Sequence, residues 1–301
     1  MASASRIVKA VIPVAGMGTR LLPATKSQPK EMLPVGRRPV VQYVAEEIES
    51  AGLKQILFVT GRKKTAIEDH FDTDTELVRL LSAADSHTLL EELNYTETEA
   101  TFFYTRQSTP LGLADAVSRA EKFVGDDHFV VALGDSIIRS DSGGGFLPRL
   151  IDAHRRSGAA CTIALEEVDP SDTYRYGIVR VASGTDQNGP FEIEDLIEKP
   201  AIGTAPSNLA IAARYVFSPA IFEAIRRTAP DRKGELQLTD SIRLLTQLGH
   251  PVYGLCLRWG ERRYDIGNFE SYFTAFIDFA LADEKYGYMV RQYLKRKARE
   301  L

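Results

Sequence analysis

The chain has few of the residues that disulfide-based or metal-based scaffolds need. Only two cysteines occur in its 301 residues, Cys161 and Cys256, and both lie in apolar stretches. Free cysteines in such stretches are usually small buried hydrophobic residues, and two are too few for a disulfide framework or a zinc site. The five histidines, at positions 70, 87, 128, 154 and 250, are not spaced as metal ligands are.

Long apolar runs and an excess of positive charge are also absent. No apolar run approaches the roughly 18 residues of a membrane-spanning helix, and residues 1–6 carry no hydrophobic signal core. The formal net charge is −4, from 37 Lys and Arg against 41 Asp and Glu. This balance argues against nucleic acid or an anionic membrane as the main partner. We therefore expect a cytoplasmic protein with no nucleic-acid and no membrane partner.

Strand-like and helix-like patterns alternate through the first half of the chain. The apolar runs typical of buried strands are residues 7–14, 55–60, 101–106 and 129–133. Segments with helical spacing are residues 40–50, 65–71, 77–93 and 113–124. This β-α-β alternation predicts an α/β fold with an open, mostly parallel sheet that helices cover on both faces.

The second half has a different pattern, with more strands joined by turns. We predict strands at 161–168, 176–181, 193–198, 209–217 and 252–258, and helices at 147–157, 221–228 and 238–248. The tail is predicted to form two helices, 272–281 and 283–300. Its aromatic residues indicate packing, against the body of the protein or against another subunit.

The most informative segment is residues 10–35, where a buried strand leads into a glycine turn. Gly16 and Gly18 are followed by three cations, Arg20, Lys26 and Lys30, among prolines 23, 29 and 34. The first 40 residues carry seven Lys or Arg against one acid, Glu31, so positive charge is concentrated here. Glycines bring backbone N–H groups close to a ligand, and fixed cations beside them suit phosphate.

Two other interpretations of this segment are weaker. A dinucleotide fingerprint would need a small residue at its third glycine position, which is Leu21 here. A purely structural turn would need no cations held among prolines. The ATPase motif Gly-x-x-x-x-Gly-Lys-Ser/Thr does not occur anywhere in the chain.

The segment from Gly16 to Val35 resembles the signature of the sugar-1-phosphate nucleotidylyltransferases. Further matching segments follow in the family's order along nearly the whole chain: residues 70–72, Asp135, residues 176–179, 198–200, 207–211, 234–240 and 265–268. The form Lys30-Glu31-Met32 and the segments 70–72 and 76–77 are similar to the bacterial branch that joins UTP to glucose 1-phosphate. A signature of this length is specific for the family and less so for the substrate.

The resemblance implies a Rossmann-like, three-layer nucleotidyltransferase fold of the glycosyltransferase-A type, with a mostly parallel mixed sheet and a helical C-terminal tail. Residues 1–268 would form the nucleotidyltransferase domain, with a nucleotide half at about 1–140 and a sugar half at about 141–268. Residues 269–301 would pack on the body or form an oligomer contact. The resemblance also implies a homo-oligomer, a dimer or a tetramer.

The implied reaction is an in-line attack of glucose 1-phosphate on the α-phosphorus of UTP. It would give UDP-glucose and pyrophosphate without a covalent intermediate, through positioning and electrostatic stabilisation. Arg20 and Lys30 would hold the triphosphate, and Lys199 would neutralise the incoming phosphate. Mg²⁺ would be held by Asp135, which follows a buried strand, and by Asp265.

The remaining implied site residues fall into two groups. Those placed around the nucleotide are Ala15, Gly16, Gly18, Thr19, Glu31, Gln107 and Gly112, with Gln107 offering a donor and an acceptor to the pyrimidine. Those placed around the sugar phosphate are Gly177, Glu198, Lys199 and Asn208. Because Pro200 follows Lys199, we expect the backbone of that lysine to be extended.

Two positions depart from the uridylyl branch. Its usual Gly-Leu-Gly-His-Ala is Gly112-Leu113-Ala114-Asp115-Ala116 here, and Gly134 stands where proline is common before the metal-binding aspartate. Both forms are closer to the thymidylyltransferase branch. A glucose-1-phosphate thymidylyltransferase, or an enzyme for another sugar, therefore remains an alternative. A catalytically silent nucleotide-sugar-binding regulator is another, although the full set of charges argues for catalysis.

Overall fold

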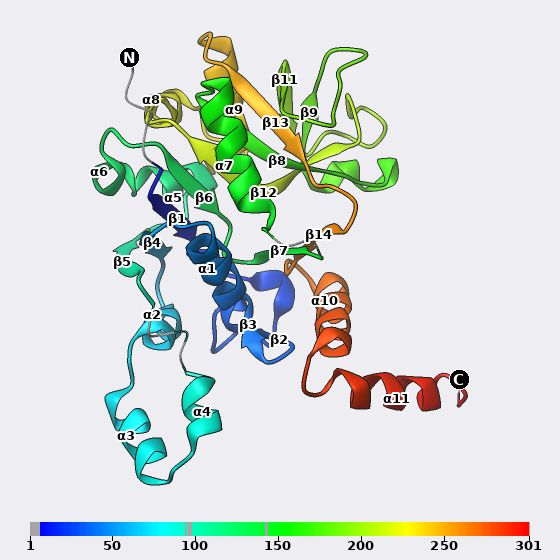
Figure 1. Ribbon diagram of the computed structural model, residues 1–301. Helices are drawn as coiled ribbons and strands as arrows, with labels where there is room; N and C mark the ends of the chain where they lie inside the picture. Colours follow the sequence, from blue (N-terminus) through cyan, green and yellow to red (C-terminus); the bar gives the residue numbers. More distant parts are fainter. Residues whose placement is uncertain (1–6, 94, 96–97, 142–143, 301) are drawn as a thin grey trace.

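A computed structural model describes residues 7–93, 95, 98–141 and 144–300, and a ten-stranded sheet is its main feature (Figure 1). Eight strands cross the sheet in the order β10 (Phe191–Glu192), β13 (Val252–Cys256), β8 (Cys161–Glu167), β12 (Leu209–Phe217), β6 (Phe129–Ala132), β1 (Lys9–Pro13), β4 (Gln55–Thr60) and β5 (Thr101–Arg106). The other two, β9 (Gly177–Arg180) and β11 (Asp195–Glu198), pair with each other, and β9 also pairs with β12.

The sheet is mixed because one strand runs against its neighbours at the centre. Strands β6, β1, β4 and β5 are parallel to one another. Strand β12 is antiparallel to both β6 and β8, and β13 runs parallel to β8. Strand β12 therefore joins the strands of the first half of the chain to those of the second half in one continuous sheet.

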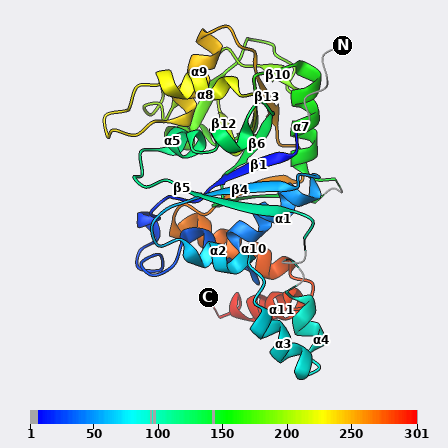
Figure 2. The ribbon, with the colours of Figure 1, turned by 90° about the vertical axis from the view of Figure 1, so that its left-hand side faces the viewer.

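Helices cover both faces of the sheet because its central strands are apolar on both sides. In β1, Val11 belongs to one core and Ala10 and Ile12 belong to the other, and all three are fully buried. The first core is covered by α5 (Leu113–Ser118), α6 (Glu121–Val124), α8 (Ala220–Arg227) and α9 (Leu238–Gln247), and the second by α1 (Val40–Ser50), α2 (Thr65–Phe71) and α7 (Phe146–Ser157) (Figure 2). The predicted three-layer α/β fold is confirmed.

A third core lies outside these layers, where two short ribbons meet the first of the two C-terminal helices. The ribbons are β2 (Pro34–Val35) with β3 (Arg38–Pro39), and β7 (Ser136–Ser140) with β14 (Glu261–Asp265). Helix α10 (Phe269–Ala282) packs on both through Val35, Tyr264 and Ala275. The last helix, α11 (Gly287–Lys297), projects from the body, as does the pair α3 (Thr75–Ala83) and α4 (His87–Glu91) (Figures 1 and 2).

Several predicted elements have other bounds in the structure. The helix predicted at 77–93 is two helices, α3 and α4, and that at 113–124 is divided into α5 and α6. The strand predicted at 193–198 is present as β11 and begins two residues later, at Asp195, whereas the separate two-residue strand β10 before it was not predicted. The last helix begins at Gly287, because the Asp283 side chain accepts hydrogen bonds from the N–H groups of Lys285 and Tyr286 in the turn before it. No described helix is both long and apolar enough to cross a membrane.

A buried histidine makes stability depend on pH. His154 on α7 is 1% exposed and contacts Thr162 Oγ1 at 2.9 Å and His128 Nδ1 at 2.7 Å. Burial lowers the pKa of His154 to about 3, whereas an unfolded histidine titrates near 6.5. Protonation therefore favours the unfolded chain. The stability that neutral His154 contributes is complete above pH 6.5 and is lost as the pH falls toward 3.

We expect the free energy of urea unfolding to decrease between pH 7 and pH 5, and to decrease less steeply in a His154→Gln variant. His87→Gln is the matched control, because His87 lies exposed at the start of α4. If the free energy of unfolding fell equally steeply with pH in the wild type and in His154→Gln, His154 would not be a source of the pH dependence.

Candidate functional site

The loop after β1 is bent at a glycine and fixed by a threonine. Gly18 has a φ of 66° and starts a short 3₁₀ turn, Thr19–Leu21. Thr25 Oγ1 donates to the Gly18 carbonyl at 2.7 Å. A Cβ atom on Gly16 would lie 3.7 Å from Lys30 Nζ. The bare backbone of the loop therefore lies against a fixed cation, as the sequence predicted.

Four of the predicted charged residues lie close together. Lys30 forms an ion pair with Asp135, which follows β6. A Cβ atom on Gly267 would lie 3.2 Å from both Arg20 Nη2 and Asp265 Oδ2, so Arg20 and Asp265 meet at this glycine. The β7–β14 ribbon brings Asp135 and Asp265 together. It pairs Ser136 with Asp265, and the Ile266 N–H donates to the Asp135 carbonyl at 2.8 Å.

The two carboxyl groups have pKa values displaced in opposite directions. Burial raises the pKa of Asp265, and the negative charge of Asp135 raises it further. Burial also acts to raise the pKa of Asp135, but the Lys30 ammonium outweighs it and holds the value below the usual range. Burial acts to lower the pKa of Lys30, and Asp135 and Glu31 more than offset it, so that pKa is raised.

The Asp135–Asp265 pair is a chemically suitable magnesium site. Both side chains supply hard oxygen donors at one place, and a bound cation would relieve their mutual repulsion. Among the described residues no cluster of three or more His, Cys, Asp and Glu could hold a metal ion. Mg²⁺ commonly uses one or two protein carboxylates and completes its shell with water and substrate phosphates, so two donors fit that mode of binding.

Two cavities lie beside the residues that were predicted to bind the nucleotide. These adjoining hollows, of about 360 and 270 Å³, share Ala15, Gly16, Met17, Gln107 and Pro110. The smaller one also reaches Lys30, Gly112 and Asp135. The structure thus brings Ala15, Gly16, Gln107 and Gly112 together beside the charged cluster. Thr19 is exposed in the turn after Gly18.

Gln107 is arranged differently from the predicted donor–acceptor pair. It is 6% exposed, and its amide nitrogen donates to the Gly112 carbonyl at 3.0 Å and to Asp115 Oδ2 at 2.8 Å. These two bonds use both hydrogens of the amide. The donor that was predicted to face the pyrimidine is therefore already used within the protein, and the carbonyl oxygen is the atom that remains.

Glu31, predicted to contact the nucleotide, lies under the loop. It is 1% exposed and forms an ion pair of 2.7 Å with the buried Lys64. Burial raises the pKa of Glu31, with Lys64 and Lys30 acting against the rise. This pair fixes the turn Lys30–Met32 from inside. A contact between Glu31 and the nucleotide stays a prediction.

The sugar side of the site is built on the β9–β11 pair, in which Gly177 lies opposite Glu198. Glu198 Oε2 accepts from Thr239 Oγ1 at 2.7 Å, and Oε1 pairs with Lys199 Nζ at 3.0 Å. A Cβ atom on Gly177 would lie 2.8 Å from Ile211 Cδ1 and 3.1 Å from Glu198 Oε2. Any residue larger than glycine at 177 would therefore push these groups apart.

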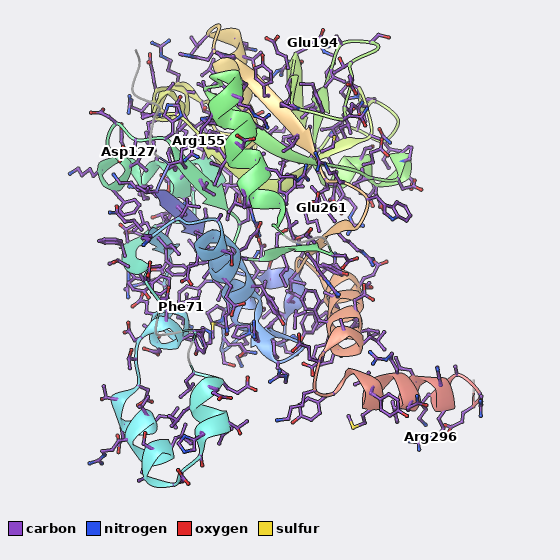
Figure 3. All side chains as sticks on the ribbon, in the orientation of Figure 1. Phe71, Asp127, Arg155, Glu194, Glu261 and Arg296 are labelled. Carbon is purple, nitrogen blue, oxygen red and sulfur yellow. The ribbon has the colours of Figure 1, made fainter. Side chains whose placement is uncertain are left out.

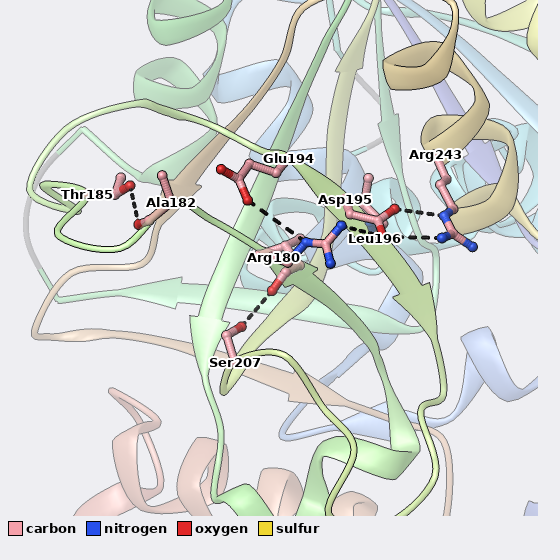
Figure 4. Close-up of polar contacts among 9 residues, drawn as sticks. Arg180, Ala182, Thr185, Glu194, Asp195, Leu196, Ser207 and Arg243 are labelled. Carbon is pink, nitrogen blue, oxygen red and sulfur yellow. Dashed lines mark hydrogen bonds and ion pairs between the residues drawn. The ribbon is translucent and has the colours of Figure 1, made fainter.

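An ion network fixes the same two strands. Arg180 on β9 and Arg243 on α9 both bind Asp195 on β11, with Arg180 Nη2 at 3.0 Å and Arg243 Nε at 2.7 Å, and Ser207 Oγ donates to the Val179 carbonyl at 2.6 Å (Figure 4). Asn208, the next residue, accepts from the Val168 N–H through its carbonyl at 3.0 Å. Its predicted side-chain contact with the sugar stays a prediction.

The expectation of an extended backbone at Lys199 is wrong. Its φ is 45°, in the left-handed region that non-glycine residues rarely adopt. The Lys199 N–H donates to the Tyr176 carbonyl at 3.0 Å, which continues the β9–β11 pairing one residue further and holds this conformation. Such strain is concentrated at functional sites, and the lysine side chain remains exposed at the edge of the site.

Sequence reasoning missed three residues that support the site: Asp115, Thr239 and Arg263. Arg263 forms an ion pair with Glu166, and its guanidinium lies over the Tyr176 ring, 4.9 Å from the centroid. It lines one cavity together with Tyr176 and Asp265. The available signal was strand periodicity, since Arg263 and Asp265 are two residues apart and so share a face of β14.

Comparisons with known proteins point to one family. The family model described as Nucleotidyl transferase matches residues 9–280. The chain is 41% identical over 291 residues to UTP–glucose-1-phosphate uridylyltransferase 2 of Staphylococcus saprophyticus, covering 97% of this chain and 98% of the relative. A UTP-bound UGPase from Acinetobacter baumannii has a TM-score of 0.89 at 36% identity, covering 96% and 99% of the two chains. A UDP-glucose pyrophosphorylase complexed with UDP-glucose has a TM-score of 0.82 at 33% identity, covering 92% and 100%.

Proposed function

Because the chain belongs to the nucleotidyl transferase family, we propose that it transfers a uridylyl group from UTP to glucose 1-phosphate. The products are UDP-glucose and pyrophosphate. The observation that supports this best is the cluster of Arg20, Lys30, Asp135 and Asp265, which lies next to the hollow at Gln107. The names of the relatives at 41% and 39% identity support the choice of UTP and glucose.

In the proposed reaction a phosphate oxygen of glucose 1-phosphate attacks the α-phosphorus of UTP. A phosphorus–oxygen bond forms on one side, and the bond to pyrophosphate breaks on the other. The attacking oxygen is already charged, so the protein needs no nucleophile of its own. Arg20 and Lys30 hold the triphosphate and the leaving pyrophosphate, and Lys199 neutralises the incoming phosphate. Asp135 and Asp265 would hold a magnesium ion, which supplies positive charge beside the reacting phosphates.

Release of pyrophosphate from glucose 1-phosphate and each of UTP, dTTP, CTP and ATP tests the proposal. We expect the highest kcat/KM with UTP. A higher value with dTTP would favour the thymidylyltransferase alternative. Tight binding of UDP-glucose without pyrophosphate release from any of the four would indicate a silent regulator instead.

Lys199→Ala should lower kcat by about 10²–10³-fold with a much smaller change in KM. The ammonium meets the most negative charge when the two phosphates approach in the transition state. Steady-state kinetics at saturating UTP measure the effect. Lys122→Ala, which removes an exposed lysine of α6, is the control. A nearly normal kcat with only a raised KM would show that Lys199 merely binds substrate.

We also propose that the chain forms a dimer or a tetramer through its C-terminal helices. The exposed apolar side chains on α10 and α11 are those of Phe273, Phe276, Ile277, Tyr288, Met289, Tyr293 and Leu294. Within α11 the charged residues, Arg296 among them, are all basic (Figure 3). The projecting α3–α4 pair offers Glu76 and Glu91 with exposed leucines, so it complements α11 of a second copy.

Light scattering after size exclusion should give the mass of two or four chains, and Tyr288→Asp together with Met289→Asp should shift it to one. A wild-type protein that is monomeric at ~10 μM would contradict the proposal, since stable assembly is expected of an interface of standard size.

A further inference from the structure

Gln107 has no freedom in the direction of its amide. Its nitrogen faces the Gly112 carbonyl at 3.0 Å and the Asp115 carboxylate at 2.8 Å. Both partners are acceptors only, so the NH₂ group must face them. A reversed amide would place its oxygen against two other oxygens. The carbonyl oxygen of Gln107 is therefore the atom turned away from Gly112 and Asp115.

Asp115 is itself held in place. It is 6% exposed and lies in the first turn of α5. Arg119, one turn later, donates from Nη2 to Asp115 Oδ1 at 2.6 Å. The other oxygen, Oδ2, is the one that receives the Gln107 amide. Each carboxylate oxygen therefore has its own partner. The bond from Arg119 to Oδ1 orients the carboxylate, and the bond from Gln107 to Oδ2 orients the Gln107 amide.

We propose that Asp115 is a positioning residue for base selection, which makes Gln107 present only a hydrogen-bond acceptor to the pyrimidine. This inference rests on the proposed function, because it takes the hollow at Gln107 as the base site. The atom that Gln107 recognises is then the N3–H donor of the base.

This arrangement distinguishes bases by the hydrogen at N3. Uracil and thymine both carry a hydrogen there and can donate it to Gln107 Oε1. Cytosine has a lone pair at N3, and its nearest donor is the 4-amino group, so the base would have to shift in the hollow before Gln107 Oε1 could accept a hydrogen bond from it. A site built for one hydrogen bond rejects analogues that lack it more strongly than a hydrophobic pocket rejects an extra methyl group. The contact therefore favours UTP over CTP, and it does not separate UTP from dTTP.

The test compares UTP with CTP in the full-length protein, by equilibrium binding and by kcat/KM with glucose 1-phosphate. The variants are Asp115→Asn and Asp115→Ala. Asparagine can turn its NH₂ toward Gln107 and favour the reversed amide, and alanine removes one of the two acceptors, which leaves only the Gly112 carbonyl to orient the amide. We expect the preference for UTP over CTP to fall by about tenfold or more in both variants, which is the effect of losing one oriented hydrogen bond.

Two controls separate positioning from a general structural effect. Arg119→Gln removes the other partner of Asp115 and keeps its carboxylate, so the UTP preference should fall less than in Asp115→Ala. In a Gln107→Ala background, Asp115→Ala should change the preference by less than about twofold, since the two residues act through one contact. Thermal unfolding checks that each variant is folded.

An unchanged UTP-to-CTP ratio in folded Asp115→Ala, or a full effect of Asp115→Ala in the Gln107→Ala background, would overturn the inference. The two proposals fail in different ways. If the wild type binds UTP in preference to CTP but releases no pyrophosphate, the proposed reaction is wrong, and the binding data still test Asp115.

Discussion

Replacing Asp135 with asparagine should lower magnesium-dependent kcat by about 10²–10³-fold or more. The substitution removes one of two half-buried carboxylates that we propose as metal ligands, and it also removes the partner of Lys30. Electrostatic groups at a reacting phosphate contribute on this scale. Pyrophosphate release measured across a magnesium titration reports the loss.

The control for Asp135→Asn is the same substitution at an aspartate outside the site. Asp127→Asn removes a carboxylate paired with Lys9 near the start of β6, away from the site (Figure 3). It should leave kcat within about twofold, because this pair lies at the other end of β6 from Asp135 and contributes little beyond local stability. Asp135→Asn should keep its thermal midpoint within a few degrees. A folded Asp135→Asn protein with more than a tenth of wild-type activity would exclude Asp135 from the metal site.

Arg214→Met should reduce the free energy of unfolding by about 3–5 kcal/mol, because it leaves an acid inside the protein without its partner. Arg214 is fully buried on β12, and its side chain reaches Glu47 of α1, the helix that covers this face of the sheet. Its Nη2 donates to Glu47 Oε2 at 2.7 Å and to the Ser136 carbonyl at 2.8 Å. A register shift in β12 and a φ of 59° at Ala213 accompany this placement.

The paired substitution separates the cost of an unpaired charge from the cost of lost packing. Arg214→Met with Glu47→Leu removes both charges and should recover part of the stability that Arg214→Met loses. Denaturant unfolding of the wild type, both single variants and the double variant measures this coupling. Two results would contradict a stabilising ion pair between Arg214 and Glu47. One is a loss below about 1 kcal/mol in Arg214→Met, and the other is a double variant whose loss equals the sum of the two single losses.

The pattern of apolar residues was sufficient to predict the bounds of helices and strands that are buried through apolar side chains. The bounds of α1, β4, α2, β5 and β12 are those predicted, since each contains a run or a helical spacing of apolar residues. The β7–β14 ribbon was missed for the opposite reason. The sequence of β14 is Glu-Arg-Arg-Tyr-Asp, and its charges are satisfied by ion pairs with other elements rather than by solvent.

The local motifs of the site were predictable from the sequence, but the contacts between residues far apart in the chain were not. The glycine turn and the cation after it follow from the sequence between Gly16 and Lys30. The ion pair between Lys30 and Asp135 does not, because no local pattern relates residues so far apart. Arg214 had a readable signal, a charge in the middle of an apolar strand, which requires a buried partner. Its partner Glu47 could be identified only from the packing of α1 on the sheet.

The β7–β14 ribbon also determines when, during synthesis and folding, Asp135 and Asp265 can come together. Strand β7 leaves the ribosome with the first half of the protein, whereas β14 ends at Asp265, close to the last helices. Until that strand has been synthesised, Asp135 has no second carboxylate beside it, even if the parallel strands have already collapsed. Contacts between such distant segments are the slow ones to form. The two carboxylates therefore meet late in folding, and a chain that ends before residue 265 lacks the second carboxylate.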